Sequence, residues 1–353
     1  MHELFALMIE KRASHFHVVP GSPIMMRSNG VLAPLDNRML SPADTAALVE
    51  SFLTEEQRYY FQENKDLNIS QSVPGLSRFR VNIFQQRGSV ACVVATHPPS
   101  PPTIDELGLP DIIQKLALNS RQGLILVCGP RGSGKSSTLA AMVNYILEMR
   151  TCQIISLENP IDYLHKNKKG IICQREIGTD TLSFEAAIES LMHQQPDVLI
   201  STEFDTYEVA NTLVNMAAGG TLCIATTRAP SVAVVLENII NLYPPHLNQQ
   251  VRTMLSVGLE AVVAQVLVQK ASGTGLVPVF EIMVGTPGVR SLIRENKIYQ
   301  IQSVMSTSGR EHGMNTQEQA LRQFVKKNII TQDEAYSKAV RPEDFKKLMS
   351  LPY

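Results

Sequence analysis

The chain has 353 residues, of which 44% are apolar and 18% are charged, so its composition is that of a globular protein with room for two domains. A formal net charge of −1 gives no sign of a general nucleic-acid binder, although it leaves room for a local basic patch. The five cysteines lie far apart without a CxxC pair, and this spacing favours buried thiols in a reducing compartment over a disulfide framework.

We expect the first hundred residues to combine helices with short strands. The N-terminus, MHELFALMIEKRASHF, carries acids in its first turns and predicts an amphipathic helix rather than a signal peptide. A cap residue, a proline and an acid at Ser41, Pro42 and Asp44 predict the start of a second helix, and TEEQ at 54–57 is a capping box that opens a third. The stretch SRFRVNIFQQRGSVACVVAT, which alternates and then becomes apolar, predicts strands.

A proline-rich stretch, HPPSPPTIDELGLP, follows these strands and contains five prolines. Proline removes backbone donors and forces an extended chain, so this stretch predicts a linker. We therefore place an N-terminal domain at residues 1–97 and a linker at residues 98–110.

Beyond the linker, apolar runs of strand length alternate with segments of helix length. The strand candidates are GLILVCG, QIISLE, DVLIST and TLCIATT. Such alternation predicts an α/β domain with a mainly parallel sheet and helices on both faces, which we place at residues 111–285. Two short capped helices in TQEQALRQFVKKNIITQDEAYSKA predict a helical C-terminal region at residues 286–353. The longest apolar stretch, MLSVGLEAVVAQVLVQ, is interrupted by Glu260 and Gln265 and is too short to span a bilayer, so we expect a soluble cytoplasmic protein.

A phosphate-binding loop is predicted where GPRGSGKSS lies between a strand candidate and a helix candidate. Its glycines let successive backbone N–H groups turn toward one anion, and the start of the helix adds its dipole. In such a loop Lys135 reaches the β and γ phosphates and Ser136 ligates Mg²⁺, so ATP and Mg²⁺ are the expected ligands. The residues expected to contact the nucleotide here are Gly129, Gly132, Ser133, Gly134, Lys135, Ser136 and Ser137.

Two carboxylates follow apolar strands of the same predicted sheet. Glu203 ends PDVLISTE, where an acid that holds Mg²⁺ through water belongs, and Glu158 in ISLENPID is a candidate base for the attacking water. Either carboxylate could instead cap a helix or carry a surface charge. Because the carboxyl ends of parallel strands share one edge, two such acids favour the catalytic interpretation, and with Lys135 they form our predicted catalytic set.

Several ordered motifs resemble those of the type IV pilus retraction ATPases, the PilT/PilU-like members of the secretion ATPase superfamily. They are GPRGSGKSSTLAAMVNYI, LENPIDYLH, QREIGTDTLSFEAAIESLMHQQPD and GVRSLIRENKI, with RFRVN and PTIDELGLP nearer the N-terminus. The resemblance implies a PAS-like α+β domain followed by a RecA-like ATPase core, assembled as a homo-hexameric ring. GVRSLIRENKI, together with the lack of a tetracysteine zinc motif, favours retraction over pilus assembly.

The resemblance also implies a cellular role. Such motors couple ATP binding and hydrolysis to pilus disassembly, and thereby to twitching motility. They lie in the cytoplasm, peripheral to the inner membrane at the pilus base. The implied partners are an inner-membrane platform protein and a paralogous retraction ATPase, with no direct contact to nucleic acid.

By its motifs the resemblance assigns site residues. Glu158 corresponds to the acid of the family's Asp box and Glu203 to the Walker B glutamate. Arg175 lies in the region that supplies arginines to the nucleotide. Arg78 and Arg80 match arginines of the N-terminal domain that face the nucleotide, although an arginine pair on a strand reads equally well as a solvated face.

The chain departs from the family pattern at positions that sense the reaction. The departures are Asn159 for an aspartate, Thr202 for a glycine, Thr179 for an arginine, Asp205 for an arginine and Arg228 for a histidine. Since Asp205 and Arg228 have opposite signs, we hypothesise that they form a substitute ion pair.

These departures leave two functions open. One is a retraction motor, and the other is a weakly hydrolysing or inactive accessory ring that binds nucleotide and assists a competent paralogue. A nucleic-acid motor is disfavoured by the near-zero charge and the lack of an aromatic and basic groove. We hypothesise that hydrolysis is weak or conditional.

Overall fold

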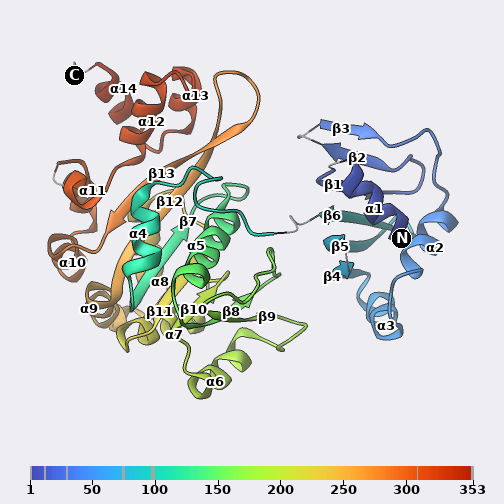
Figure 1. The fold of residues 1–353 in the computed structure, drawn as a ribbon, viewed down its shortest axis with the longest axis horizontal. Coiled ribbons are helices and arrows are strands. Elements are labelled where there is room, and N and C mark those ends of the chain that lie inside the picture. Colours follow the sequence, from blue (N-terminus) through green and yellow to red (C-terminus); the bar gives the residue numbers. More distant parts are fainter. Residues whose placement is uncertain are drawn as a thin grey trace. The chain divides into compact units, whose positions relative to one another are not determined.

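The computed structural model describes residues 2–11, 13–28, 31–73, 76–96, 100–307 and 309–350. The chain divides into two compact units, one formed by residues 1–100 with 162–164 and the other by residues 101–161 with 165–353 (Figure 1). Each unit has a sheet and a core of its own.

The first unit is an antiparallel sheet with helices. Its helices are α1 (His2–Glu10), α2 (Pro42–Glu50) and α3 (Glu55–Asn64). Its strands are β1 (His15–Val18), β2 (Met25–Ser28), β3 (Val31–Pro34), β4 (Asp66–Val73), β5 (Ser77–Gln86) and β6 (Ser89–Thr96). Among the described residues the strands follow the order β3-β2-β1-β6-β5-β4. The predicted helix starts are confirmed, because Ser41 and Thr54 each form a capping box with the residue three positions on.

The second unit contains the phosphate loop. Its strands are β7 (Gly123–Cys128), β8 (Gln153–Glu158), β9 (Ile171–Glu176), β10 (Val198–Ser201), β11 (Leu222–Thr227), β12 (Leu259–Gln269) and β13 (Leu276–Val284). Its first helices are α4 (Asp111–Asn119), α5 (Lys135–Met149), α6 (Phe184–Gln194), α7 (Tyr207–Ala218), α8 (Val232–Leu242) and α9 (Asn248–Gly258). In the described residues the strand order is β13-β12-β7-β11-β10-β8-β9, and every neighbouring pair is parallel except β12 with β13.

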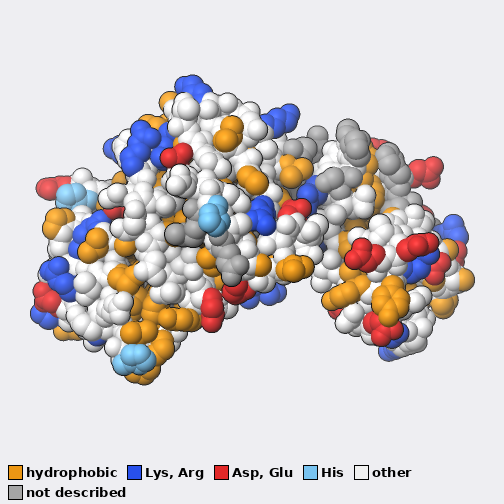
Figure 2. Space-filling model, turned by 90° about the horizontal axis from the view of Figure 1, so that it is seen from below, with side chains coloured by type: hydrophobic (Ala, Val, Ile, Leu, Met, Phe, Trp, Pro, Cys, Tyr) orange, Lys and Arg blue, Asp and Glu red, His pale blue; other side chains and the backbone are white. Residues whose placement is uncertain are grey.

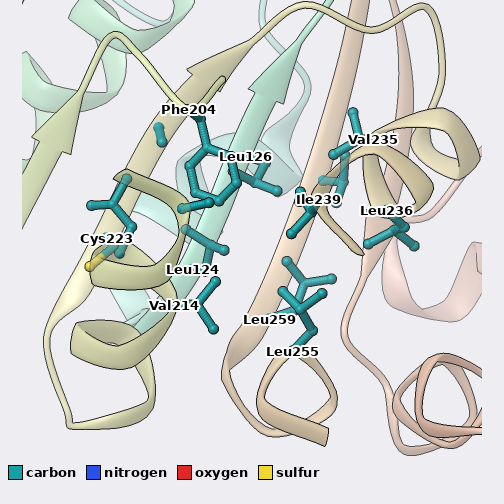
Figure 3. Close-up of a cluster of buried hydrophobic side chains, with 14 of the residues drawn as sticks. Leu124, Leu126, Phe204, Val214, Cys223, Val235, Leu236, Ile239, Leu255 and Leu259 are labelled. Carbon is teal, nitrogen blue, oxygen red and sulfur yellow. The ribbon is translucent and has the colours of Figure 1, made fainter. Parts of the chain in front are cut away.

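Strand β7 explains why helices cover both faces of this sheet. All six of its residues are buried, and successive side chains point to opposite faces. Leu124 and Leu126 enter a core with side chains of α7, α8 and α9, whereas Ile125 and Val127 enter a second core with α4 and α5. Figure 3 shows part of the first core. The predicted mainly parallel sheet with helices on both faces is therefore confirmed.

The chain from Pro101 onward packs with the second unit. Thr103 and Glu106 exchange hydrogen bonds, with the Glu106 carboxylate accepting from the Thr103 N–H at 2.8 Å and the Thr103 hydroxyl accepting from the Glu106 N–H at 3.2 Å. Ile104 and Leu109 are buried against α4 and α5. Residues 98 and 99 of the predicted linker lie outside the described residues.

Helices follow the sheet to the C-terminus. They are α10 (Pro287–Arg294), α11 (Ile301–Thr307), α12 (Gln317–Lys326), α13 (Gln332–Lys338) and α14 (Pro342–Ser350), with short 3₁₀ turns at Pro245–Leu247, Ile298–Gln300 and Gly309–His312. Thr316 and Thr331 cap the two helices that the sequence predicts. Leu321 and Phe345 of this region pack on Val268 and Val279 of β12 and β13. None of the described helices is long and apolar enough to cross a membrane.

The expectation of buried thiols is correct for four cysteines and wrong for Cys173. Cys92 and Cys223 lie in cores, and burial raises the pKa of each thiol to about 12. Cys173 is exposed because its strand, β9, forms the edge of the sheet and has a neighbour on one side alone.

Charges of both signs are present on the surface. On the face in Figure 2, Lys and Arg side chains are interspersed with Asp and Glu side chains. This agrees with a chain that has 32 basic and 33 acidic residues.

Candidate functional site

The phosphate loop joins the end of β7 to the start of α5. Gly129, Gly132 and Gly134 have φ values of 155°, 75° and 88°, which favour glycine. At Gly129 space is equally restrictive, because a Cβ atom there would lie 2.3 Å from the Gln265 carbonyl oxygen and 2.5 Å from the Ser133 Oγ. The loop is therefore shaped so that its backbone can turn toward an anion at the start of α5.

Polar groups of the loop fit a bound phosphate. The Ser133 Oγ is buried, and the described residues offer it no hydrogen-bond partner. The Lys135 Nζ donates to the carbonyl oxygens of Gly129 and Pro130 at 2.8 and 2.9 Å. Burial lowers the pKa of Lys135. Phosphate oxygens would satisfy both side chains, so the fit agrees with the predicted nucleotide site.

Arg228 follows the strand beside the loop. The end of β11 pairs with the end of β7, with Thr227 opposite Cys128, so Arg228 and the first glycine of the loop each directly follow the last paired residues of neighbouring strands. The positive charge of Arg228 adds to burial in lowering the pKa of Lys135. Within the described residues the exposed Arg228 side chain makes no hydrogen bond or ion pair. Arg228 therefore adds positive charge near the phosphate loop.

The hypothesised pair between Asp205 and Arg228 does not form. The Asp205 carboxylate accepts a hydrogen bond from the Thr227 hydroxyl at 2.8 Å, and the described part of the chain shows no ion pair between Asp205 and Arg228. A nearby hydroxyl satisfies the carboxylate without the entropy cost of ordering a long arginine side chain.

Glu158 ends β8 and is buried. Its Oε1 accepts from the Ser156 hydroxyl at 2.7 Å and from the Gln174 side-chain amide at 2.9 Å. Two donors from β8 and β9 thus orient the carboxylate. An oriented, buried carboxylate is what a general base requires.

Glu203 lies in the turn after β10, and neighbouring residues fix this turn. The Phe204 ring is buried and reaches toward Leu126 of β7 (Figure 3). The Thr226 hydroxyl donates to the Thr202 carbonyl oxygen at 2.9 Å. On the other side, the Asn159 side-chain amide donates to the Glu203 Oε1 at 2.8 Å.

The strand order brings the predicted catalytic set to one edge of the sheet. Strands β7, β11, β10 and β8 are consecutive and parallel, so Lys135, Glu203 and Glu158 all follow carboxyl ends on that edge. Because β11 separates β7 from β10, the Glu203 backbone begins about 10 Å across the sheet from the loop. That spacing leaves room for a phosphate chain between them.

The predicted arginine Arg175 is not joined to this set within the described residues. Arg175 lies on the edge strand β9, and its guanidinium donates to the Ser190 hydroxyl at 2.8 Å and to the Asp180 carbonyl oxygen at 3.5 Å. Arg78 and Arg80 lie on β5 of the first unit. Their roles toward a nucleotide stay predictions.

Gln265 is a residue of the site that we did not predict. It lies on β12, is 5% exposed, and its Oε1 accepts from the Thr138 hydroxyl of α5 at 2.7 Å. Its Nε2 lies 2.8 Å from where a Cβ on Gly134 would be. The sequence does show this residue as a polar interruption of an apolar strand, but we interpreted the interruption only as evidence against a membrane span.

Replacing Gln265 with leucine is expected to weaken ADP binding about tenfold, since the buried Thr138 hydroxyl loses its acceptor and the loop loses its polar neighbour. Binding of a fluorescent ADP to the full chain measures this effect. Gln269→Ala, on the exposed end of the same strand, is the control and should bind within about twofold of wild type. Unchanged affinity in Gln265→Leu contradicts the supporting role.

Comparison with known proteins shows similarity over nearly the whole chain. A family model described as Type II/IV secretion system protein matches residues 5–337. The Type IV pilus ATPase PilU of Pseudomonas aeruginosa is 38% identical over 349 residues, which cover 99% of this chain and 91% of that protein. The Type IV pilus retractation ATPase PilT of the same organism is 36% identical over 343 residues, with coverages of 97% and 99%.

A solved structure gives the same result. The crystal structure of the pilus retraction motor PilT with bound ADP superposes with a TM-score of 0.91 at 36% identity and covers 98% of both chains. The expected fold class is therefore confirmed: an N-terminal PAS-like α+β domain precedes a RecA-like P-loop ATPase domain with a helical C-terminal appendage.

Proposed function

Because the chain belongs to the Type II/IV secretion system protein family, we propose that it is an ATP-driven motor of type IV pilus retraction. The observation that best supports this function is that the phosphate loop, Glu158 and Glu203 share one edge of the sheet, in a chain of which 98% superposes on a pilus retraction motor. The protein is a P-loop ATPase that couples ATP binding and hydrolysis to pilus disassembly, and so to twitching motility.

Different residues of the site perform different parts of ATP hydrolysis. The loop N–H groups and Lys135 bind the β and γ phosphates, and the start of α5 adds its dipole. Ser136 and, through water, Glu203 would hold Mg²⁺, which supplies positive charge to the phosphates. Glu158 accepts the proton of the attacking water, because its carboxylate is oriented by Ser156 and Gln174.

We extend the proposal to assembly. The active form is a homo-hexameric ring in which Arg78, Arg80 and Arg175 bring positive charge to bound nucleotide. The ring lies in the cytoplasm, peripheral to the inner membrane, where an inner-membrane platform protein of the pilus is its partner. The support is the family membership and the solvent exposure of Arg80 on β5.

A second role is favoured by the charges beside the loop. The charges of Asp205 and Arg228 both affect the pKa of Lys135. One relative of the chain is a PilU. Altered charges beside the phosphate loop favour a ring that acts as an accessory subunit and assists a paralogous retraction ATPase. Expression with and without an active paralogue distinguishes the two roles, because an accessory ring restores motility only when that paralogue is present.

Restoring the family charges is expected to raise ATP turnover. Asp205→Arg combined with Arg228→His should increase kcat at least about tenfold, since charge at the transferred phosphate controls phosphoryl transfer. Magnesium-dependent phosphate release from the purified full chain measures it, beside each single variant. Robust wild-type turnover that the double change leaves unaltered contradicts a suppressive role of Asp205 and Arg228. Undetectable turnover in every variant, with or without a paralogue, contradicts the ATPase function itself.

A further inference from the structure

Two of the departures from the family pattern touch one another. The Asn159 backbone N–H donates to the Thr202 hydroxyl at 3.0 Å, and the Asn159 side-chain amide donates to the Glu203 Oε1 at 2.8 Å. One residue after β8 therefore holds two consecutive residues after β10. Both bonds join segments 43 or 44 residues apart, so they fix the approach of two strand ends.

The side-chain chemistry of Asn159 and Thr202 is what allows these two hydrogen bonds. An aspartate at position 159 would place its own carboxylate within hydrogen-bond distance of the Glu203 carboxylate, and like charges at that distance repel. A glycine at position 202 would offer no hydroxyl to the Asn159 N–H, leaving that donor to solvent. Asn159 and Thr202 are therefore compatible with each other and with a closely held Glu203.

The turn that carries Glu203 is otherwise fixed through its backbone and through Phe204. Thr226 holds the Thr202 carbonyl oxygen, and the Ser201 hydroxyl donates to the Glu203 carbonyl oxygen at 2.5 Å. Within the described part of the chain, the hydrogen bond to the Glu203 carboxylate itself comes from Asn159. An amide-to-carboxylate bond of this kind is charge-assisted and fixes the rotamer of the acid.

We propose that Asn159 is a positioning residue for the Glu203 carboxylate, and that Thr202 orients Asn159 in turn. The pair holds Glu203 in one orientation, and the described residues leave its second carboxylate oxygen able to accept from water. This inference deepens the proposed function and rests on it, because it assigns Glu203 to the reaction. Asn159 touches no reacting atom and acts through Glu203 alone.

Kinetics of the full chain test the proposal. Asn159→Ala is expected to lower kcat for Mg-ATP about tenfold and to leave KM within about twofold, because the phosphate loop is untouched. Asn159→Asp should lower kcat further, since it replaces a donor with a like charge. Thr202→Ser keeps the hydroxyl and should retain wild-type kcat, whereas Thr202→Val removes it and should reduce kcat. Asn215→Ala, which removes a similar amide bond on the exposed face of α7, is the matched control.

Thermal melting without nucleotide gives a readout that does not depend on turnover. If the two side chains act on each other, the Tm losses of Asn159→Ala and Glu203→Ala will not add in the double variant. Additive Tm losses, or an Asn159→Ala variant whose KM rises as much as its kcat falls, overturn the proposal. A wild-type chain that binds ADP without hydrolysing ATP contradicts the proposed function, and the melting cycle then still decides whether Asn159 holds Glu203.

Discussion

Replacing Lys135 with alanine is expected to lower ATP turnover roughly a hundredfold or more and to weaken ATP binding, because the γ phosphate loses the cation that neutralises it. In the structure the Lys135 Nζ bonds only to the carbonyl oxygens of Gly129 and Pro130 among the residues described. Removing this partly buried cation therefore leaves no buried acid unpaired, and the fold should be unaffected.

Steady-state phosphate release, fluorescent-nucleotide binding and Tm check this result together. Lys115→Ala, an exposed lysine of α4 in the same unit, is the matched control and should leave all three unchanged. A Lys135→Ala chain with wild-type turnover shows that the measured hydrolysis does not occur at this loop. A chain with a lowered Tm shows instead that Lys135 supports the fold.

Replacing Glu158 with glutamine is expected to lower kcat about a hundredfold to ten-thousandfold, because the amide is isosteric but cannot accept the proton of the attacking water. The glutamine carbonyl oxygen can still accept from Ser156 and Gln174, so the local structure should persist. Single-turnover hydrolysis and ADP affinity, measured on one preparation, separate the chemical step from binding.

The control for this change is Glu237→Gln, an exposed acid of α8, for which kcat should stay within about twofold. Loss of ADP affinity in parallel with kcat contradicts a role for Glu158 as a base. That pattern indicates that the Glu158 carboxylate and its two donors, Ser156 and Gln174, serve to hold β8 against β9.

The phosphate loop could be predicted from the sequence because its signal is local. Strand, glycines, lysine and helix are contiguous from Gly123 to Met149, and each obeys short-range backbone rules. Glu158 and Glu203 could be predicted for a related reason, since each ends an apolar strand and parallel strands share one carboxyl edge.

Contacts between distant segments could not be predicted in this way. Thr138 and Gln265 are 127 residues apart, and their bond depends on β12 lying beside β7, which periodicity does not reveal. The exposure of Cys173 depends on β9 lying at the sheet edge. Opposite charge was an insufficient guide for Asp205 and Arg228, because the hydroxyl of Thr227, the residue before Arg228, donates to the Asp205 carboxylate.

The burial of Phe204 has a mechanical consequence. Its ring belongs to the same continuous core as Ile239 of α8 and Val289 and Ile293 of α10, the helix that contains the first part of the GVRSLIRENKI motif. Close-packed interiors have low compressibility, so the turn beside Glu203 has little room to shift independently of this core. Phe204 therefore ties the position of the turn beside Glu203 to the packing of the core that α8 and α10 share.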